Sequence, residues 1–223
     1  MLPSKLLWHY LMAISIIAGS TGLIGRSVLE VLCSKQESVI ALTRRPISDL
    51  PTNANELILD FDSFEKNGSL PTCNHVFICL GTTIKKAGSQ ENFRKVDVGY
   101  CLSIANKAKE SGAETLSLVS CIGADSTSKN FYLKTKGELE EAIQELKFSV
   151  LNIYRPSFLV GQRSEKRLSE IVLLKFVKVM DFVLVGSASK YRSVKAELLA
   201  KTMASRIDSK PGVNYFYFDD LLK

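Results

Sequence analysis

An apolar segment that leads directly into three evenly spaced glycines constrains this chain more than any other feature. Residues 13–18 (A-I-S-I-I-A) read as a buried strand, and the glycines follow in a G-x-x-G-x-x-G pattern before a helical segment at 24–34. A strand that turns through glycines into a helix can bind a pyrophosphate with the amide groups at the helix N-terminus. The alternative is a structural turn without a ligand. The predicted phosphate-binding residues are Gly19, Ser20, Thr21, Gly22, Leu23, Ile24 and Gly25.

Strand-like and helical segments alternate along the chain after this turn. The strands are short and almost continuously apolar, which is typical of a parallel sheet covered by helices on both faces. The pattern therefore predicts a doubly wound α/β domain of the Rossmann type. Further strands are expected at 38–43, 56–60, 75–80, 115–120 and 148–154, and helices at 90–110 and 130–146.

We expect one dinucleotide-binding domain over residues 12–223, preceded by an N-terminal extension at 1–11. The start of the chain superficially resembles a secretory signal, but cleavage at 13–18 would destroy the first strand. After Pro156 the alternation becomes irregular, and residues 157–223 are predicted to form a small C-terminal subdomain. Its expected elements are helices near 165–184 and 195–206 and a strand at 213–218.

An apolar stretch at 168–186 raises the question of a membrane span. It contains Glu170, Lys175, Lys178 and Asp181, and such charges are costly in a bilayer. We therefore expect a core helix or a homodimer contact and no membrane association.

Composition and charge limit the remaining classes of function. The net charge is +6, but the basic residues are scattered, so a nucleic-acid partner is not expected. The five cysteines form no C-x-x-C pair and there are only two histidines, which supports neither a metal site nor a disulfide framework. Most of the cysteines lie in apolar segments, so buried reduced thiols and a cytoplasmic location are expected.

The residues after the second and third strands indicate which dinucleotide would bind. Arg44 and Arg45 follow the second strand, where an acidic residue would bind the ribose hydroxyl of NAD. Two guanidinium groups suit the 2′-phosphate of NADP(H), unless both are simply solvated. Asp60 and Phe61 are candidates for the edge and face of the adenine. Leu80, Gly81 and Thr82 end the fourth strand at the same carboxyl edge.

Tyr132 and Lys136 are the predicted acid–base pair. Their spacing places them on one face of the expected helix, where a lysine cation would lower the tyrosine pKa and make it a usable acid or base. Ser120, at the end of the fifth strand, could orient a substrate carbonyl. Tyr191 and Lys195 repeat the spacing but follow no comparable strand. The alternative for Tyr132 is a half-buried helix residue without a catalytic role.

Together these segments resemble the atypical short-chain dehydrogenase/reductases, and within them the Tat-interacting-protein oxidoreductase-like group. The similarity extends over about residues 13–205. Besides the glycine turn, it is carried by C-L-G-T-T-I-K-K-A-G-S at 79–89, F-R-K-V-D at 93–97, S-C-I-G-A-D at 120–125, F-Y-L-K-T-K-G-E-L-E at 131–140 and Y-R-P-S-F-L-V-G at 154–161.

The resemblance implies NADP(H) binding. Our first hypothesis is an oxidoreductase acting on a small carbonyl or alcohol, since the segment after the sixth strand is short for a large nucleotide-sugar substrate. The resemblance also implies that Ser120, Tyr132 and Lys136 form the active site, that Lys136 also holds the nicotinamide ribose, and that Pro156 and Ser157 line the nicotinamide. Many members have an asparagine in a proton relay where this chain has Asp97. Some relatives are described as regulators, so an idle NADP(H)-binding protein that docks a partner is the second hypothesis.

Overall fold

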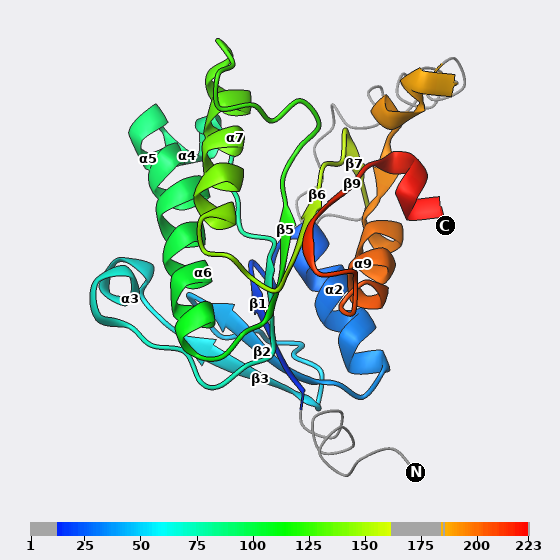
Figure 1. The fold of residues 1–223 in the computed structure, drawn as a ribbon. Helices are drawn as coiled ribbons and strands as arrows, with labels where there is room; N and C mark the ends of the chain where they lie inside the picture. Colours follow the sequence, from blue (N-terminus) through cyan, green and yellow to red (C-terminus); the bar gives the residue numbers. More distant parts are fainter. Residues whose placement is uncertain (1–12, 162–183, 185, 223) are drawn as a thin grey trace.

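The computed structural model describes residues 13–161, 184 and 186–222, and it contains one seven-stranded parallel sheet (Figure 1). The strand order is β3-β2-β1-β4-β5-β6-β9, and each neighbouring pair is parallel. The expected doubly wound fold is therefore confirmed. The strands are β1 (Ile14–Ala18), β2 (Ser38–Thr43), β3 (Ala54–Ile58), β4 (His75–Ile78), β5 (Thr115–Val119), β6 (Val150–Tyr154) and β9 (Gly212–Phe216).

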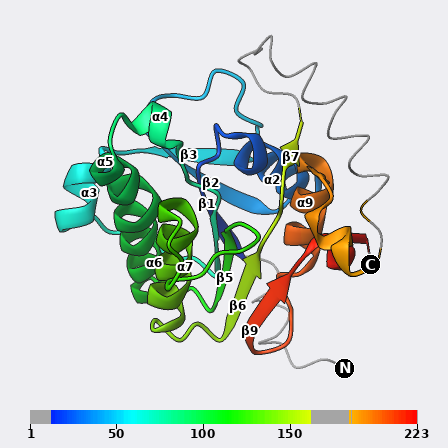
Figure 2. The ribbon, with the colours of Figure 1, turned by 90° about the horizontal axis from the view of Figure 1, so that it is seen from above.

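Helices cover both faces of this sheet. On one face lie α3 (Phe61–Asn67), α6 (Cys101–Glu110) and α7 (Phe131–Gln144). On the other face, α2 (Leu23–Ser34) and α9 (Ala196–Ser205) lie side by side (Figure 2). The remaining elements are the short helices α4 (Ile84–Ala87) and α5 (Gln90–Arg94), a π-helical segment Lys95–Tyr100, a small sheet of β7 (Leu159–Val160) and β8 (Val194–Lys195), and 3₁₀ helices Gly186–Tyr191 and Phe218–Leu222.

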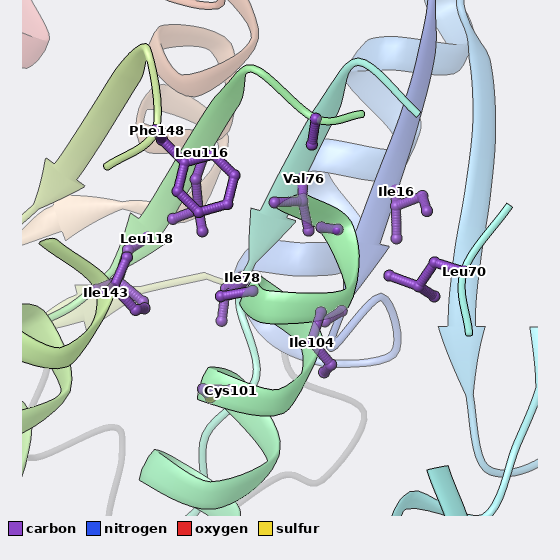
Figure 3. Close-up of a cluster of buried hydrophobic side chains, with 14 of the residues drawn as sticks. Ile16, Leu70, Val76, Ile78, Cys101, Ile104, Leu116, Leu118, Ile143 and Phe148 are labelled. Carbon is purple, nitrogen blue, oxygen red and sulfur yellow. The ribbon is translucent and has the colours of Figure 1, made fainter. Parts of the chain in front are cut away.

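Alternate side chains of the central strands enter two separate hydrophobic cores. Ile16 and Val76 point towards α6 and α7 (Figure 3), whereas Ile17 and Phe77 pack towards α2 and α9. All four side chains are completely buried. Because both faces of each strand are covered, the strands show continuous apolar runs and not an alternating pattern.

Several expected boundaries differ from the structure. Strand β3 begins at Ala54, two residues before the predicted start, because Ala54 pairs with Val39; Asp60 instead caps α3. The single helix predicted at 90–110 is divided into α5, the π-helical segment and α6. The short helices α3 and α4 were not predicted, since neither is long enough for a clear apolar period.

The C-terminal part contributes to the main layers. The late strand is found as β9, where it extends the sheet beside β6, and the second C-terminal helix is found as α9. The extension at 1–11 and almost all of the helix predicted at 165–184 lie outside the described residues, so the subdomain boundary stays a prediction. In the part of the chain that the structure describes, no helix has the length and apolar character needed to cross a membrane.

The start of α2 is packed tightly against the turn that precedes it. Gly19 has a φ of +86°, a conformation that favours glycine. A Cβ atom on Gly25 would lie 2.2 Å from the carbonyl oxygen of Gly19, which is far closer than two such atoms can approach. Gly25 therefore permits the first turn of α2 to contact the end of β1, and this contact fixes where the helix N-terminus points.

We predict that Gly25→Ala lowers the free energy of unfolding by about 2–3 kcal/mol, because the added methyl group meets main-chain atoms that must move. Thermal or urea unfolding measures the loss. Ser27→Ala is the matched control on the same helix, since the Ser27 hydroxyl bonds only to the carbonyl of Leu23 one turn earlier. Equal stability of the two variants would contradict the close packing.

Candidate functional site

The candidate site lies at the carboxyl edge of the sheet, between β1 and β4. Strands β2 and β3 extend the sheet on one side of β1, whereas β4 and the strands after it extend the sheet on the other side. Such a reversal opens a crevice at the strand ends, which is where ligands bind in open α/β sheets. A Cβ atom on Gly19 would lie 2.6 Å from the carbonyl oxygen of Cys79, so the glycine turn closely approaches the segment after β4.

The glycine turn has the chemistry of a phosphate site. Gly22 is the N-cap of α2 and carries no capping side chain, and the first turn contains no acidic residue. The first amides of a helix have no partner within the helix, so those of Leu23, Ile24 and Gly25 are available to an anion. The Ser20 hydroxyl is buried and lacks a hydrogen-bond partner among the described residues, whereas Thr21 is exposed. These residues therefore fit a dinucleotide pyrophosphate.

The residues predicted near the adenosine separate into two groups. Arg44 and Arg45 directly follow β2 and are exposed, as a site for a 2′-phosphate requires. Asp60 caps α3 by accepting a hydrogen bond from the amide of Ser63 (2.8 Å). Phe61 is only 6% exposed and stacks on Tyr100 at 5.2 Å, so the prediction that its ring presents a face to adenine is wrong. The core takes this ring because α3 begins at Phe61 and turns it inwards.

After β4, the chain is held in place by Asp97 of the π-helical segment. The amide of Thr82 donates a hydrogen bond to the Asp97 carboxylate at 2.7 Å. A Cβ atom on Gly81 would lie 3.3 Å from the same carboxylate, which is a tight approach. Leu80 packs at the margin of the core. Thus Leu80, Gly81 and Thr82 lie at the carboxyl edge where the sequence placed them, but Asp97 sets their position.

Tyr132 and Lys136 lie one turn apart on α7, whose N-terminus is capped by Asn130. Tyr132 is 37% exposed and packs its ring against Phe93, whereas Lys136 is buried. Burial raises the pKa of Tyr132 to about 12, and the neighbouring Lys136 offsets this only in part. Lys136 does act to lower the pKa of Tyr132, as expected, but desolvation of the phenolate outweighs the attraction of the lysine, so the pKa is raised on balance.

A buried carboxylate limits how far Lys136 can offset the desolvation of Tyr132. The Lys136 ammonium lies 2.7 Å from Asp97, and the two side chains are 7% and 1% exposed. A cation paired with an anion at this distance exerts a much weaker field on a third group. Sequence reasoning placed Asp97 in the position of a relay asparagine; the structure shows a buried ion pair.

Ser120 belongs to a network that was not predicted. Its hydroxyl donates a hydrogen bond to Glu140, whose carboxylate also pairs with the Arg155 guanidinium. Arg155 in turn donates to the hydroxyl of Tyr217 (3.1 Å) and lies over the ring of Tyr215. The Ser120 hydroxyl thus already donates its hydrogen bond to Glu140, so in this arrangement it does not offer a hydrogen bond to a substrate carbonyl.

The spacing along α7 is the signal that could have revealed Glu140. Tyr132, Lys136 and Glu140 are each four residues apart and so share one helix face. By contrast, Tyr191 ends a 3₁₀ helix and Lys195 lies in β8, so the second Tyr-x-x-x-Lys pair does not share a helix face.

The segment after β6 contributes main-chain contacts. The Pro156 carbonyl accepts a hydrogen bond from the amide of Ile122 (3.0 Å), and the Ser157 hydroxyl donates to the carbonyl of Arg192. Pro156 therefore lies beside the segment after β5, which carries Cys121, and the burial of that thiol raises its pKa. All five cysteines are free thiols; Cys79 is partly buried and the other four are buried.

We predict that Arg155→Met destabilises the protein by about 3 kcal/mol, because it leaves the buried Glu140 carboxylate without its cation. Urea unfolding measures the change, and Arg155→Met/Glu140→Gln should recover most of it. The matched control is Arg94→Met, which breaks the more exposed pair with Glu138 and should cost at most about 1 kcal/mol. Additive losses in the double variant would contradict the network.

Curated proteins resemble this chain over most of its length. It is 40% identical to "Protein FMP52, mitochondrial" of Candida albicans over 157 residues, which are 67% of this chain and 68% of that protein. It is 34% identical to "Protein HTATIP2" of Rattus norvegicus over 166 residues, 72% of this chain and 68% of that protein. For the FMP52 protein of Meyerozyma guilliermondii the identity is 40%, with 67% and 66% covered, so the chain spans about two thirds of these relatives. No family model matches the chain.

Solved structures with the same fold are more distant in sequence. A UDP-glucose 4-epimerase of Thermotoga maritima with UDP-glucose superposes with a TM-score of 0.70 at 16% identity, covering 92% of this chain and 76% of the epimerase. The human epimerase family protein SDR39U1 with NADPH gives a TM-score of 0.63 at 14% identity, with 92% and 74% covered. These likenesses establish the Rossmann-type fold.

The relatives correct the expected location. Four of the similar fungal proteins, from different species, are named as mitochondrial, so the prediction of a cytoplasmic protein is wrong. That prediction was based on reduced thiols. Buried free thiols indicate reducing surroundings or simple inaccessibility to oxidants, and neither property distinguishes one compartment from another.

Proposed function

Because this chain belongs to the HTATIP2/FMP52-like group of the atypical short-chain dehydrogenase/reductases, we propose that it binds NADP(H) and acts as an oxidoreductase on a small carbonyl or alcohol. One observation carries the proposal: a glycine-lined helix N-terminus, with a buried Ser20 hydroxyl that has no partner among the described residues, faces the same sheet edge as Tyr132 and Lys136. The first group suits a pyrophosphate and the second suits proton transfer to a substrate oxygen.

Different residues of the chain would bind different parts of NADP(H). Amide groups of Leu23, Ile24 and Gly25, together with the Ser20 hydroxyl, would hold the pyrophosphate. Arg44 and Arg45 would bind the 2′-phosphate with charged hydrogen bonds, since Asp49, the carboxylate between β2 and β3, is paired with Arg26. When bound, the nicotinamide supplies or accepts the hydride.

Tyr132 would supply the proton that the substrate carbonyl oxygen needs. Tyr132 is a partly exposed residue of α7, and with its pKa raised to about 12 it carries its proton at neutral pH. Tyr132 would donate this proton to a substrate carbonyl oxygen as the carbonyl is reduced. Lys136, one turn further along α7, would position the phenol and reach the nicotinamide ribose.

A second function is favoured by one observation. Ser120 donates its proton to Glu140, and Lys136 is paired with Asp97, so two of the three predicted catalytic groups already have partners within the protein. This arrangement would also suit a protein that binds NADP(H) without turnover and docks a partner. Cofactor binding is common to both functions, and turnover separates them.

Titration of the protein with NADPH and NADH, followed by nicotinamide fluorescence, tests the cofactor. We expect NADPH to bind at least tenfold more tightly, and Arg44→Ala/Arg45→Ala to remove this preference by weakening NADPH about tenfold or more, the equivalent of one charged hydrogen bond. Lys107→Ala/Lys109→Ala, on α6, removes the same charge elsewhere and should leave both affinities unchanged. Equal binding of the two cofactors would refute the arginine site.

Tyr132→Phe tests catalysis. With NADPH and a panel of small aldehydes and ketones, we expect the variant to lose about 100-fold or more in turnover, because a general acid contributes that much. Its affinity for NADPH should stay within about twofold, since the phenol is not a principal cofactor ligand. The control is Tyr191→Phe, in the second Tyr-x-x-x-Lys pair. NADPH binding without turnover of any substrate would favour the regulator.

A further inference from the structure

Asp97 is the buried charge of the site to which the proposed reaction assigns no role. It lies in the π-helical segment between α5 and α6 and is almost completely buried. A buried carboxylate is costly unless it is paired and hydrogen-bonded, and Asp97 satisfies both conditions within the site itself. Its partners are the Lys136 ammonium and the Thr82 amide, each at 2.7 Å.

These two contacts join the proton-transfer side of the site to the cofactor side. Lys136 comes from α7, and Thr82 follows β4 at the crevice. Gly81 leaves no free space beside the Asp97 carboxylate, because a Cβ atom there would be 3.3 Å from its oxygen and 3.8 Å from the Lys136 nitrogen. The carboxylate is therefore held in place by the loop on one side and by the lysine on the other.

The other groups that face Tyr132 and Lys136 are neutral or act in pairs. The thiols of Cys121, after β5, and Cys101, on α6, are kept neutral because burial raises their pKa. Glu140, further along α7, is paired with Arg155. Desolvation is the main cause that raises the pKa of Tyr132. Lys136 favours ionisation of the phenol, whereas Cys121, which is hydrogen-bonded to it, and Asp97 both oppose ionisation.

We propose that Asp97 is a positioning residue that pairs with Lys136, weakens the pull of this lysine on the phenol, and so adds to burial in keeping Tyr132 a proton donor for carbonyl reduction at neutral pH. The inference rests on the proposed function for its chemical meaning, but the charge coupling itself can be measured without a substrate. Ser120 supports this inference, because its hydroxyl already donates a hydrogen bond to Glu140, which leaves Tyr132 as the proton donor to the substrate.

Carbonyl reduction is the step that this charge arrangement favours. Bound NADPH would supply the hydride for the carbonyl carbon and would leave as NADP⁺, and Tyr132 would donate its phenolic proton to the carbonyl oxygen. A C–H and an O–H bond form, the C=O double bond becomes a single bond, and Tyr132 recovers its proton from water. The reverse oxidation requires the tyrosinate, so its rate should rise with pH, while reduction should not change across neutral pH.

Tyrosinate absorbance provides the first test. The wild-type chain has seven tyrosines, and subtracting the alkaline titration of Tyr132→Phe isolates the ionisation of Tyr132. We expect no ionisation of Tyr132 at or below the ordinary tyrosine pKa of about 10. Ionisation of Tyr132 below that value in the wild-type protein would overturn the proposal, and this measurement needs no substitution at Asp97.

Asp97→Asn provides the second test, because asparagine keeps the size of the side chain and an oxygen for the Thr82 amide. The uncompensated Lys136 should then lower the pKa of Tyr132 by about one pH unit or more. Asp97→Asn/Lys136→Met removes both charges, leaves no buried ion unpaired, and should restore a titration close to wild type. Glu138→Gln is the control: it removes a carboxylate from a more exposed ion pair of the same helix and should change nothing.

The outcomes separate this inference from the proposed function. An unchanged Tyr132 titration in Asp97→Asn, or a double variant that behaves like Asp97→Asn alone, would refute the coupling even if NADPH binds. A shifted titration in a protein that fails to bind NADPH would support the coupling and refute the proposed function. A purely structural Asp97 would lower stability without moving the Tyr132 titration.

Discussion

The parallel direction of all seven strands is the constraint on which the rest of this structure depends. Because each strand of the main sheet ends at the same edge, the segments after β1, β2, β4, β5 and β6 meet there although they are far apart in sequence. Gly19 brings the first of these segments against the third. The central strands β1, β4, β5 and β6 mainly position these segments, and their own side chains are almost all buried.

Helix α7 brings the chemistry to this edge. Tyr132, Lys136 and Glu140 recur at every fourth position, so one face of the helix carries a phenol, a cation and a carboxylate towards the sheet. Each of the two buried ions meets an opposite charge from another element, Asp97 or Arg155. Such pairs contribute little net stability but make a wrong packing costly, because it would leave a charge unpaired.

The π-helical segment allows the partner of Lys136 to be buried. An added residue per turn rotates the rest of the helix by about 100° relative to a regular α-helix, so α5 and α6 direct different faces inwards. Phe93 of α5 packs against Phe131 and Tyr132, while Ile104 of α6 enters the main core. Asp97 lies between them and is turned to the site.

The sequence by itself determined the doubly wound fold, the glycine turn and the shared helix face of Tyr132 and Lys136, because these depend on local periodicity and short spacing. Only the tertiary structure decided how the site is charged. The ion pair of Lys136 with Asp97 joins residues 39 positions apart, and the hydrogen bond of Ser120 to Glu140 joins the segment after β5 to α7. The prediction for Phe61 was wrong for the same reason, since its environment is set by Tyr100. Local patterns fix which residues share a face, whereas pairing and burial, and with them the pKa of Tyr132, depend on how distant elements pack.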